Sequence, residues 1–171
     1  MRGKITLRVS FLAVLLTVAL ILSYLESIIS FGFIFPGFRL GLSNITVVVV
    51  LYFFGARFAV PFGLIKSFFS LMFLGRFSSL FFSMTGMVFS LIVMVLLRKI
   101  GKFSIYSVSA CGSVFHIWGQ IFAAAFYLSS LSAFIFIPWL SLLAVFSGIA
   151  VGWLSNIILS RLNSSICGKF R

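Results

Sequence analysis

The chain has 171 residues, of which 63% are hydrophobic and 8% charged; 13 Lys and Arg face one acid, Glu26, giving a net charge of +12. A basic soluble protein that binds nucleic acid is excluded, because so few charged side chains do not cover the polar surface that a soluble domain needs. The basic residues instead separate apolar segments long enough to cross a bilayer. We therefore expect a single all-α integral membrane domain, residues 1–171, with no nucleic-acid partner.

Six apolar segments follow one another along the chain. A segment in lipid must satisfy its own backbone hydrogen bonds, and stretches such as Ile45–Tyr52 are apolar on every face, which favours helices over barrel strands. We expect the first segment to be retained, because its apolar part is too long for a cleaved signal peptide and no small-residue cleavage site follows. The predicted spans of this six-helix bundle are residues 5–29, 43–54, 58–74, 79–97, 104–128 and 131–159.

Basic residues gather on one side of these predicted spans. With the N-terminus inside the cell, the outer side holds only Arg39 and Arg76, and Lys66 lies within a span. The inner side holds Arg2, Lys4, Arg8, Arg57, Arg98, Lys99, Lys102, Arg161, Lys169 and Arg171. Cytoplasmic segments of membrane proteins carry such an excess of Lys and Arg. We therefore predict cytoplasmic N- and C-termini and a multi-pass protein of the cell (inner, cytoplasmic) membrane.

The charges away from the cytoplasmic side are the first candidates for a binding site. They are Glu26, Arg39, Lys66 and Arg76. Ionisable groups at membrane depth are costly, so they form structural pairs, extend to the lipid head groups or line a cavity. A structural pair of Glu26 with one cation stays open as an alternative. Because one acid does not neutralise three cations, we favour a cavity for a ligand that carries phosphate, carboxylate or another electron-rich group.

The segment Pro36–Asn44 precedes the second span and adds to this candidate site. Pro36 and Gly37 predict an irregular loop, after which Ser43 or Asn44 offers an N-cap for the helix. A helix N-terminus presents free N–H groups and a positive dipole end, which suit an anionic or carbonyl-rich ligand. An ordinary capped turn is the alternative interpretation. We include Asn44 among the substrate-binding candidates because Arg39 lies beside it.

His116 and Gln120 lie four residues apart on one face of the fifth span. We expect no metal site, because the chain has one histidine and one acid and no cysteine pair near them. Polar side chains in membrane helices often bond to a neighbouring helix. The alternative is that both side chains contact a polar ring in the cavity, and we include them as substrate-binding candidates.

Small residues recur at helical spacing in the first and last spans. Ala144, Gly148, Gly152 and Asn156 predict a packing stripe for another helix. Ala13 and Thr17 form a similar stripe, which either packs internally or docks a partner subunit. The chain has no Walker A motif, no acidic cluster for magnesium and no nucleophile with orienting groups. We therefore do not expect it to be an enzyme or to use ATP by itself.

Several residue blocks resemble the Gx transporter family, which is often labelled heptaprenyl diphosphate synthase component I. The blocks are Ser23–Ser27, Pro36–Asn44 and Leu51–Gly55, with shorter matches at Ser83–Gly86, Ser90, His116, Gly119 and Gln120. They follow in order over about residues 5 to 125. The chain departs from the family pattern at Lys66, where arginine is expected, and at Ile117-Trp118, where asparagine and a small apolar residue are expected.

The resemblance implies a fold and a function. The family is similar to the S components of energy-coupling-factor vitamin transporters, which are six-helix membrane proteins that bind a vitamin near the outer face. In those transporters a transmembrane coupling subunit, driven by two ATPases, docks on the first span, which gives the Ala13 and Thr17 stripe a role. Some members are associated with flavin supply for extracytoplasmic redox proteins. The resemblance thus implies a flavin (riboflavin, FMN or FAD) as transported ligand, with no covalently bound cofactor.

Two other functions stay open from the sequence. The family label implies an accessory membrane subunit of prenyl diphosphate metabolism, accessory because the chain lacks the aspartates that hold a metal-diphosphate. A structural subunit of a membrane redox complex is the third hypothesis. A soluble, aspartate-rich partner would indicate the accessory function, ATPase partners would indicate transport, and a structural subunit would bind no small molecule.

Overall fold

The computed structural model describes residues 2–29, 41–73 and 80–170, and these residues form helices joined by short turns. No strand occurs in these ranges. The elements in order are α1 (Arg2–Ile29), α2 (Asn44–Phe54), α3 (Ala56–Phe73), α4 (Leu80–Ile100), α5 (Ile105–Leu128), the 3-10 helix η2 (Leu131–Phe136) and α6 (Ile137–Phe170). The first five predicted spans coincide with helices to within three residues, whereas the sixth begins as η2 and continues as α6, which extends past residue 159 to Phe170.

In the described parts of the chain, five helical segments are long and apolar enough to cross a membrane: Ile5–Ile28, Ala56–Phe73, Leu80–Ile100, Ile105–Leu128 and Leu131–Leu162. The chain is accordingly a multi-pass helical membrane protein. The helix α2 is different, because it has 11 residues. At 1.5 Å per residue it is about 16 Å long, roughly half the hydrocarbon thickness of a bilayer. The second predicted span is therefore a helix, but it is too short to cross the membrane unaided.

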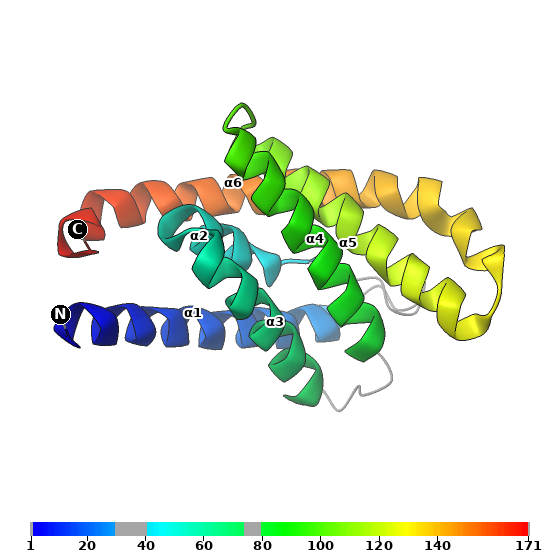
Figure 1. The fold of residues 1–171 in the computed structure, drawn as a ribbon, viewed down its shortest axis with the longest axis horizontal. Helices are drawn as coiled ribbons and strands as arrows, with labels where there is room; N and C mark the ends of the chain where they lie inside the picture. The colour runs from blue at the N-terminus through cyan, green and yellow to red at the C-terminus, as the bar shows by residue number, and fades with distance from the viewer. Residues whose placement is uncertain (1, 30–40, 74–79, 171) are drawn as a thin grey trace.

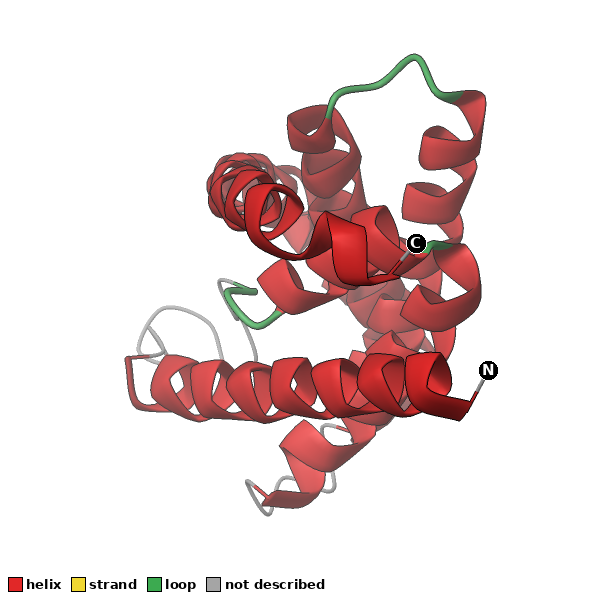
Figure 2. Ribbon diagram, turned by 90° about the vertical axis from the view of Figure 1, so that its left-hand side faces the viewer, coloured by secondary structure: helices red, strands yellow, loops and turns green. Residues whose placement is uncertain are grey.

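The helices form two groups that face each other. In one group α4, α5 and α6 pack extensively in chain order, and in the other α1 packs on α2 and α3. Contacts of α2 with α6 and of α3 with α4 join the groups. Figure 1 shows α1 and α6 along the long axis, with α1 beginning and α6 ending on the same side, and Figure 2 shows α1 along one flank of the molecule. The space between the groups holds the site described below.

Small residues on α6 allow it to approach α5 closely. A Cβ on Gly148 would lie 2.7 Å from Ala110 Cα, and a Cβ on Gly152 would lie 3.0 Å from Tyr106 Cα. Asn156 Nδ2 donates to the Tyr106 hydroxyl at 3.0 Å. These contacts confirm that the predicted stripe on α6 packs against another helix.

The centre of the hydrophobic core is α2, whose residues Val47–Leu51 are each no more than 1% exposed. A helix that is apolar all round is a buried helix, which fits this position. Its last turn is capped by Arg98 of α4, which donates through Nη1 to Leu51 O and through Nη2 to Tyr52 O at 3.2 Å. The Arg98 guanidinium also lies 5.2 Å from the Tyr52 ring centroid. The sequence placed Arg98 only as a cytoplasmic charge, whereas the fold uses it to satisfy carbonyl groups at the α2 C-terminus.

Candidate functional site

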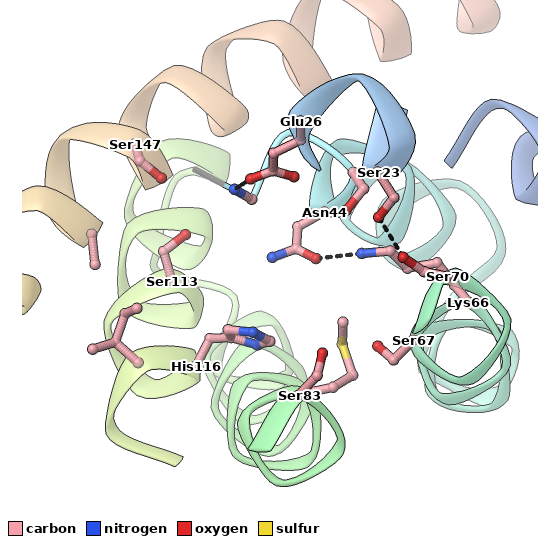
Figure 3. A pocket seen from close by; sticks show the side chains of 15 residues that line it. Ser23, Glu26, Asn44, Lys66, Ser67, Ser70, Ser83, Ser113, His116 and Ser147 are labelled. Carbon is pink, nitrogen blue, oxygen red and sulfur yellow. Dashed lines mark hydrogen bonds between the residues drawn. The ribbon is translucent and has the colours of Figure 1, made fainter. Parts of the chain in front are cut away.

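A small polar cavity lies between the two helix groups (Figure 3). Its volume is about 40 Å³. The wall contains an acid, an ammonium group, an amide, an imidazole and seven serine hydroxyls. The lining residues are Ser23, Glu26, Gly41, Ser43, Asn44, Lys66, Ser67, Ser70, Ser83, Met87, Ser113, His116, Ile117, Ala144 and Ser147. Placing polar and ionisable side chains at membrane depth costs free energy, and such residues are usually functional. This cavity is therefore the candidate functional site.

Glu26 lies near the end of α1 and is 2% exposed. Its Oε1 accepts a hydrogen bond from the backbone N–H of Gly41, three residues before α2 begins. Gly41 has φ of +78°, a left-handed conformation that a residue without Cβ adopts readily. The carboxylate therefore lies at the N-terminal end of α2, where the helix dipole favours negative charge.

Lys66 lies in the middle of α3 and is 4% exposed. Its Nζ donates to Asn44 Oδ1 at 2.7 Å, which holds the ammonium group beside the first residue of α2 (Figure 3). A second polar contact joins α3 to α1, since Ser70 Oγ donates to Ser23 Oγ at 2.7 Å. These bonds fix the start of α2 between α1 and α3.

The N-terminus of α2 is capped differently from the sequence prediction. Ser43 occupies the N-cap position but makes no side-chain cap hydrogen bond, and its backbone is already helical. The N–H groups of Asn44 and Ile45 instead bond to the carbonyls of Gly41 (2.8 Å) and Leu42 (3.1 Å). The prediction of a side-chain N-cap by Ser43 is therefore wrong, because the preceding turn, and not a side chain, provides the acceptors for the first two N–H groups of α2.

The opposite wall presents His116 from α5. Gln120 Nε2 lies 3.3 Å from His116 Nε2, so the amide of Gln120 is one partner that orients the ring. Behind them α4 crosses α5 at two glycines. A Cβ on Gly86 would lie 2.7 Å from the His116 carbonyl oxygen, and a Cβ on Gly119 would lie 2.8 Å from Gly86 Cα. The absence of side chains at this crossing is what places His116 beside the cavity.

The predicted substrate-binding residues divide into three sets. Glu26, Asn44, Lys66 and His116 line the one cavity, although they come from four different helices. Gln120 is not among the described lining residues, but its amide lies 3.3 Å from the imidazole of His116, which is. Arg39 and Arg76 lie outside the described residues. Among the described lining residues the formally charged ones are Glu26 and Lys66, and the predicted surplus of cations, which depends on Arg39 and Arg76, stays a prediction.

Serine residues are the part of the wall that sequence reasoning missed. Ser23, Ser67 and Ser113 each lie one helical turn from another lining residue: Glu26, Ser70 and His116 respectively. Residues three or four apart share a helix face. Polar pairs at this spacing inside otherwise apolar spans were therefore a signal from which these serines could have been found.

The stripe on α1 lies away from the cavity. Ala13 and Thr17 are exposed, and Thr17 Oγ1 donates to Ala13 O at 3.1 Å, within its own helix. Their polar groups are thus satisfied without a partner helix, and the small side chains leave this part of the α1 surface open to close approach. Among the described residues no group of three or more His, Cys, Asp or Glu side chains is placed to hold a metal ion.

Residues 15–158 match a protein-family model described as heptaprenyl diphosphate synthase component I. The match covers most of the chain and includes every residue that lines the cavity. It confirms the resemblance found in the sequence. No curated protein and no solved structure gives a significant match.

Proposed function

The chain belongs to the heptaprenyl diphosphate synthase component I family, and from that premise we propose that it is the substrate-binding membrane subunit of a transporter for a vitamin or cofactor. The observation that carries the proposal is the buried polar cavity, in which Glu26 and Lys66 are at most 4% exposed between apolar helices. Burying such groups costs several kcal/mol each, by order of magnitude, and a helical bundle that serves only as scaffold gains nothing from it.

The chemistry of the wall suits a polar ring system. Serine hydroxyls, the Asn44 amide and the His116 imidazole each offer donors and acceptors. A flavin carries carbonyl oxygens, ring nitrogens and one N–H, which match such a wall, and it is our first choice of ligand. It would be held non-covalently as a transported ligand rather than as a cofactor of this chain.

The cavity must widen to admit such a ligand. Its volume of about 40 Å³ accommodates on the order of three water molecules. The hydrogen bonds at Glu26, Lys66 and Ser70 link α1, α2 and α3, whereas His116 and Gln120 belong to α5. We propose that the two helix groups move apart at the cavity when the ligand enters, while Arg98 keeps the C-terminal end of α2 bonded to α4.

Transport against a concentration gradient requires an energy source, and the sequence has no Walker A motif with which to use ATP. We propose that a transmembrane coupling subunit with two ATPases supplies it and docks on the exposed Ala13 and Thr17 stripe of α1. Small residues let the backbones of two helices approach closely in lipid, where apolar burial offers no driving force. The protein itself is not an enzyme in this proposal.

The first experiment is to extract the protein in mild detergent, denature it, and record the absorbance and mass of any small molecule released. A flavin spectrum at near-equimolar amount supports the proposal. Release of no small molecule, together with no binding of added riboflavin, FMN or FAD, overturns the flavin assignment.

The family description itself favours one second candidate, an accessory membrane subunit of prenyl diphosphate metabolism. In that case the released molecule has the mass of a prenyl diphosphate, and a soluble, aspartate-rich synthase co-purifies with the chain. Co-purification of ATPases without a synthase argues against it. The same preparation therefore distinguishes the two candidates.

A further inference from the structure

We propose that the cavity selects an uncharged ligand and that Glu26 is the residue that sets this selectivity by excluding phosphorylated forms. The inference rests on the proposed binding function and deepens it. The reasoning starts from what occupies the N-terminus of α2, where a protein that binds a phosphate ordinarily places it.

The anion position at this helix terminus is taken by the protein's own carboxylate. The Gly41 N–H donates to Glu26 Oε1, and the N–H groups of Asn44 and Ile45 bond to turn carbonyls at 2.8 and 3.1 Å. These three donors have acceptors within the chain. A substrate phosphate at this point would have to displace a carboxylate that is 2% exposed and held by its backbone partner.

The ammonium group of Lys66 also has a hydrogen-bond partner within the chain. Lys66 Nζ donates to Asn44 Oδ1 at 2.7 Å. Among the described residues that line the cavity, Lys66 and Glu26 are the two formally charged groups, and His116 is the remaining titratable one. A phosphate of charge about −2 in this cavity would lie close to the Glu26 carboxylate, and the two anions would repel each other.

Most of the remaining polar groups in the wall are uncharged hydroxyl groups. Seven serines line it, and every hydroxyl both donates and accepts. A heterocycle with carbonyl and N–H groups and a hydroxylated side chain can form hydrogen bonds with such a wall throughout. The ligand class that fits is therefore an uncharged, hydrogen-bonding ring system, for which riboflavin is the probe and FMN its phosphorylated counterpart.

The test compares the affinities of riboflavin and FMN for the purified full chain in lipid nanodiscs, by quenching of flavin fluorescence. We expect riboflavin to bind at least tenfold more tightly than FMN. Equal affinity, or tighter binding of FMN, would overturn the inference and leave the proposed function standing. Binding of neither flavin would overturn the flavin assignment instead. In that case farnesol and farnesyl diphosphate replace the flavins, and a preference for the diphosphate would overturn the inference.

Variants of Glu26 test its role separately. Glu26→Gln keeps an oxygen that accepts from Gly41 N–H but removes the negative charge, so the preference for riboflavin over FMN should fall at least fivefold. Glu26→Asp keeps the charge and should keep the preference. Lys102→Gln, which changes the net charge at an exposed position outside the lining, is the matched control. An unchanged preference in Glu26→Gln, measured on folded protein, would remove Glu26 as the determinant.

Discussion

Two charged residues, Glu26 and Arg98, make hydrogen bonds between helices that no local sequence rule predicts. Glu26 lies in the last turn of α1 and accepts a hydrogen bond from Gly41, just before α2. Arg98 lies in the last turn of α4 and donates to Leu51 O, in the last turn of α2. Charged side chains from other helices therefore bond to the backbone at or next to both ends of α2, the shortest of the described α-helices. Each charge has the sign that complements the helix dipole at its end. A helix of 11 residues in a membrane protein needs such partners, because water is not available to its terminal backbone groups.

Replacement of Lys66 tests the binding site at the level of one side chain. Lys66→Met removes the ammonium group and its bond to Asn44 Oδ1 while keeping a side chain of similar length. We expect riboflavin affinity to fall about tenfold or more, which corresponds to about 1.4 kcal/mol. Titration of the purified variant checks this, with Lys102→Met as a control for the loss of one positive charge. Equal affinity of both variants and the unmodified protein would show that Lys66 does not contact the ligand.

Replacement of Arg98 tests stability. Arg98→Ala leaves the Leu51 and Tyr52 carbonyls without the guanidinium and should lower the free energy of unfolding by about 2 kcal/mol. The thermal midpoint in detergent, followed by tryptophan fluorescence, should fall accordingly. Lys99→Ala removes the same charge from the adjacent exposed position and should leave the midpoint nearly unchanged. A shift of equal size in both variants would mean that charge alone, and not capping, accounts for the effect.

At the scale of elements, the crossing of α4 and α5 determines where the imidazole lies. The backbones of the two helices meet at Gly86 and Gly119, one turn from His116. The sequence motifs that resemble the family include these glycines and His116, yet their meaning appears only when the two helices are placed together. The two glycines allow α4 and α5 to pack closely, and His116 lines the cavity beside this crossing.

An added methyl group at this crossing should separate the helices. A Cβ on Gly119 would lie 2.8 Å from Gly86 Cα and 2.9 Å from Thr85 O, which are backbone atoms that yield only if a helix moves. We expect Gly119→Ala to cost about 1–3 kcal/mol of stability and to weaken ligand binding through His116. Gly63→Ala is the control, since its Cβ would meet flexible ends of Leu91 and Met87 at 3.1 Å or more. Thermal midpoints for both variants decide the question, and equal shifts would contradict the backbone-contact explanation.

At the scale of the whole molecule, the bundle consists of long helices around one short one. α2 is buried in the hydrophobic core, whereas α1 exposes many large apolar side chains, among them Ile5, Val9, Val14, Ile21 and Ile28. In lipid such a surface needs no protein cover. The polar groups that line the cavity lie between the two helix groups.

The topology makes a prediction about the two ends of α5. Because α5 has 24 residues and rises about 36 Å, its ends should lie on opposite sides of the membrane. In a background of Cys111→Ser and Cys167→Ser, an impermeant maleimide should label Ser132→Cys in intact cells. It should label Lys102→Cys only after permeabilisation, because the basic residues mark the inner side. Labelling of both positions from the same side would refute the proposed orientation.

The sequence by itself determined the class of the protein, its helices and its family. Apolar runs separated by basic residues require helices in lipid, and these features are local, so each predicted span coincides with a helix. The resemblance carried by Ser23–Ser27 and the other blocks was confirmed by the family match. The sequence also singled out Glu26, Asn44, Lys66 and His116, because polar residues in apolar spans are conspicuous one by one.

Only the tertiary structure decided what these residues do together. Contacts between positions 15, 22 and 47 residues apart, such as Glu26 with Gly41, Lys66 with Asn44 and Arg98 with Leu51, depend on how helices cross. No local pattern encodes that geometry. The sequence therefore suggested a side-chain cap at the start of α2, whereas in the fold the preceding turn bonds to the first N–H groups, Glu26 bonds to Gly41 and Lys66 bonds to an amide. The physical reason is that hydropathy and spacing define each helix separately, while packing between helices decides which polar groups satisfy one another.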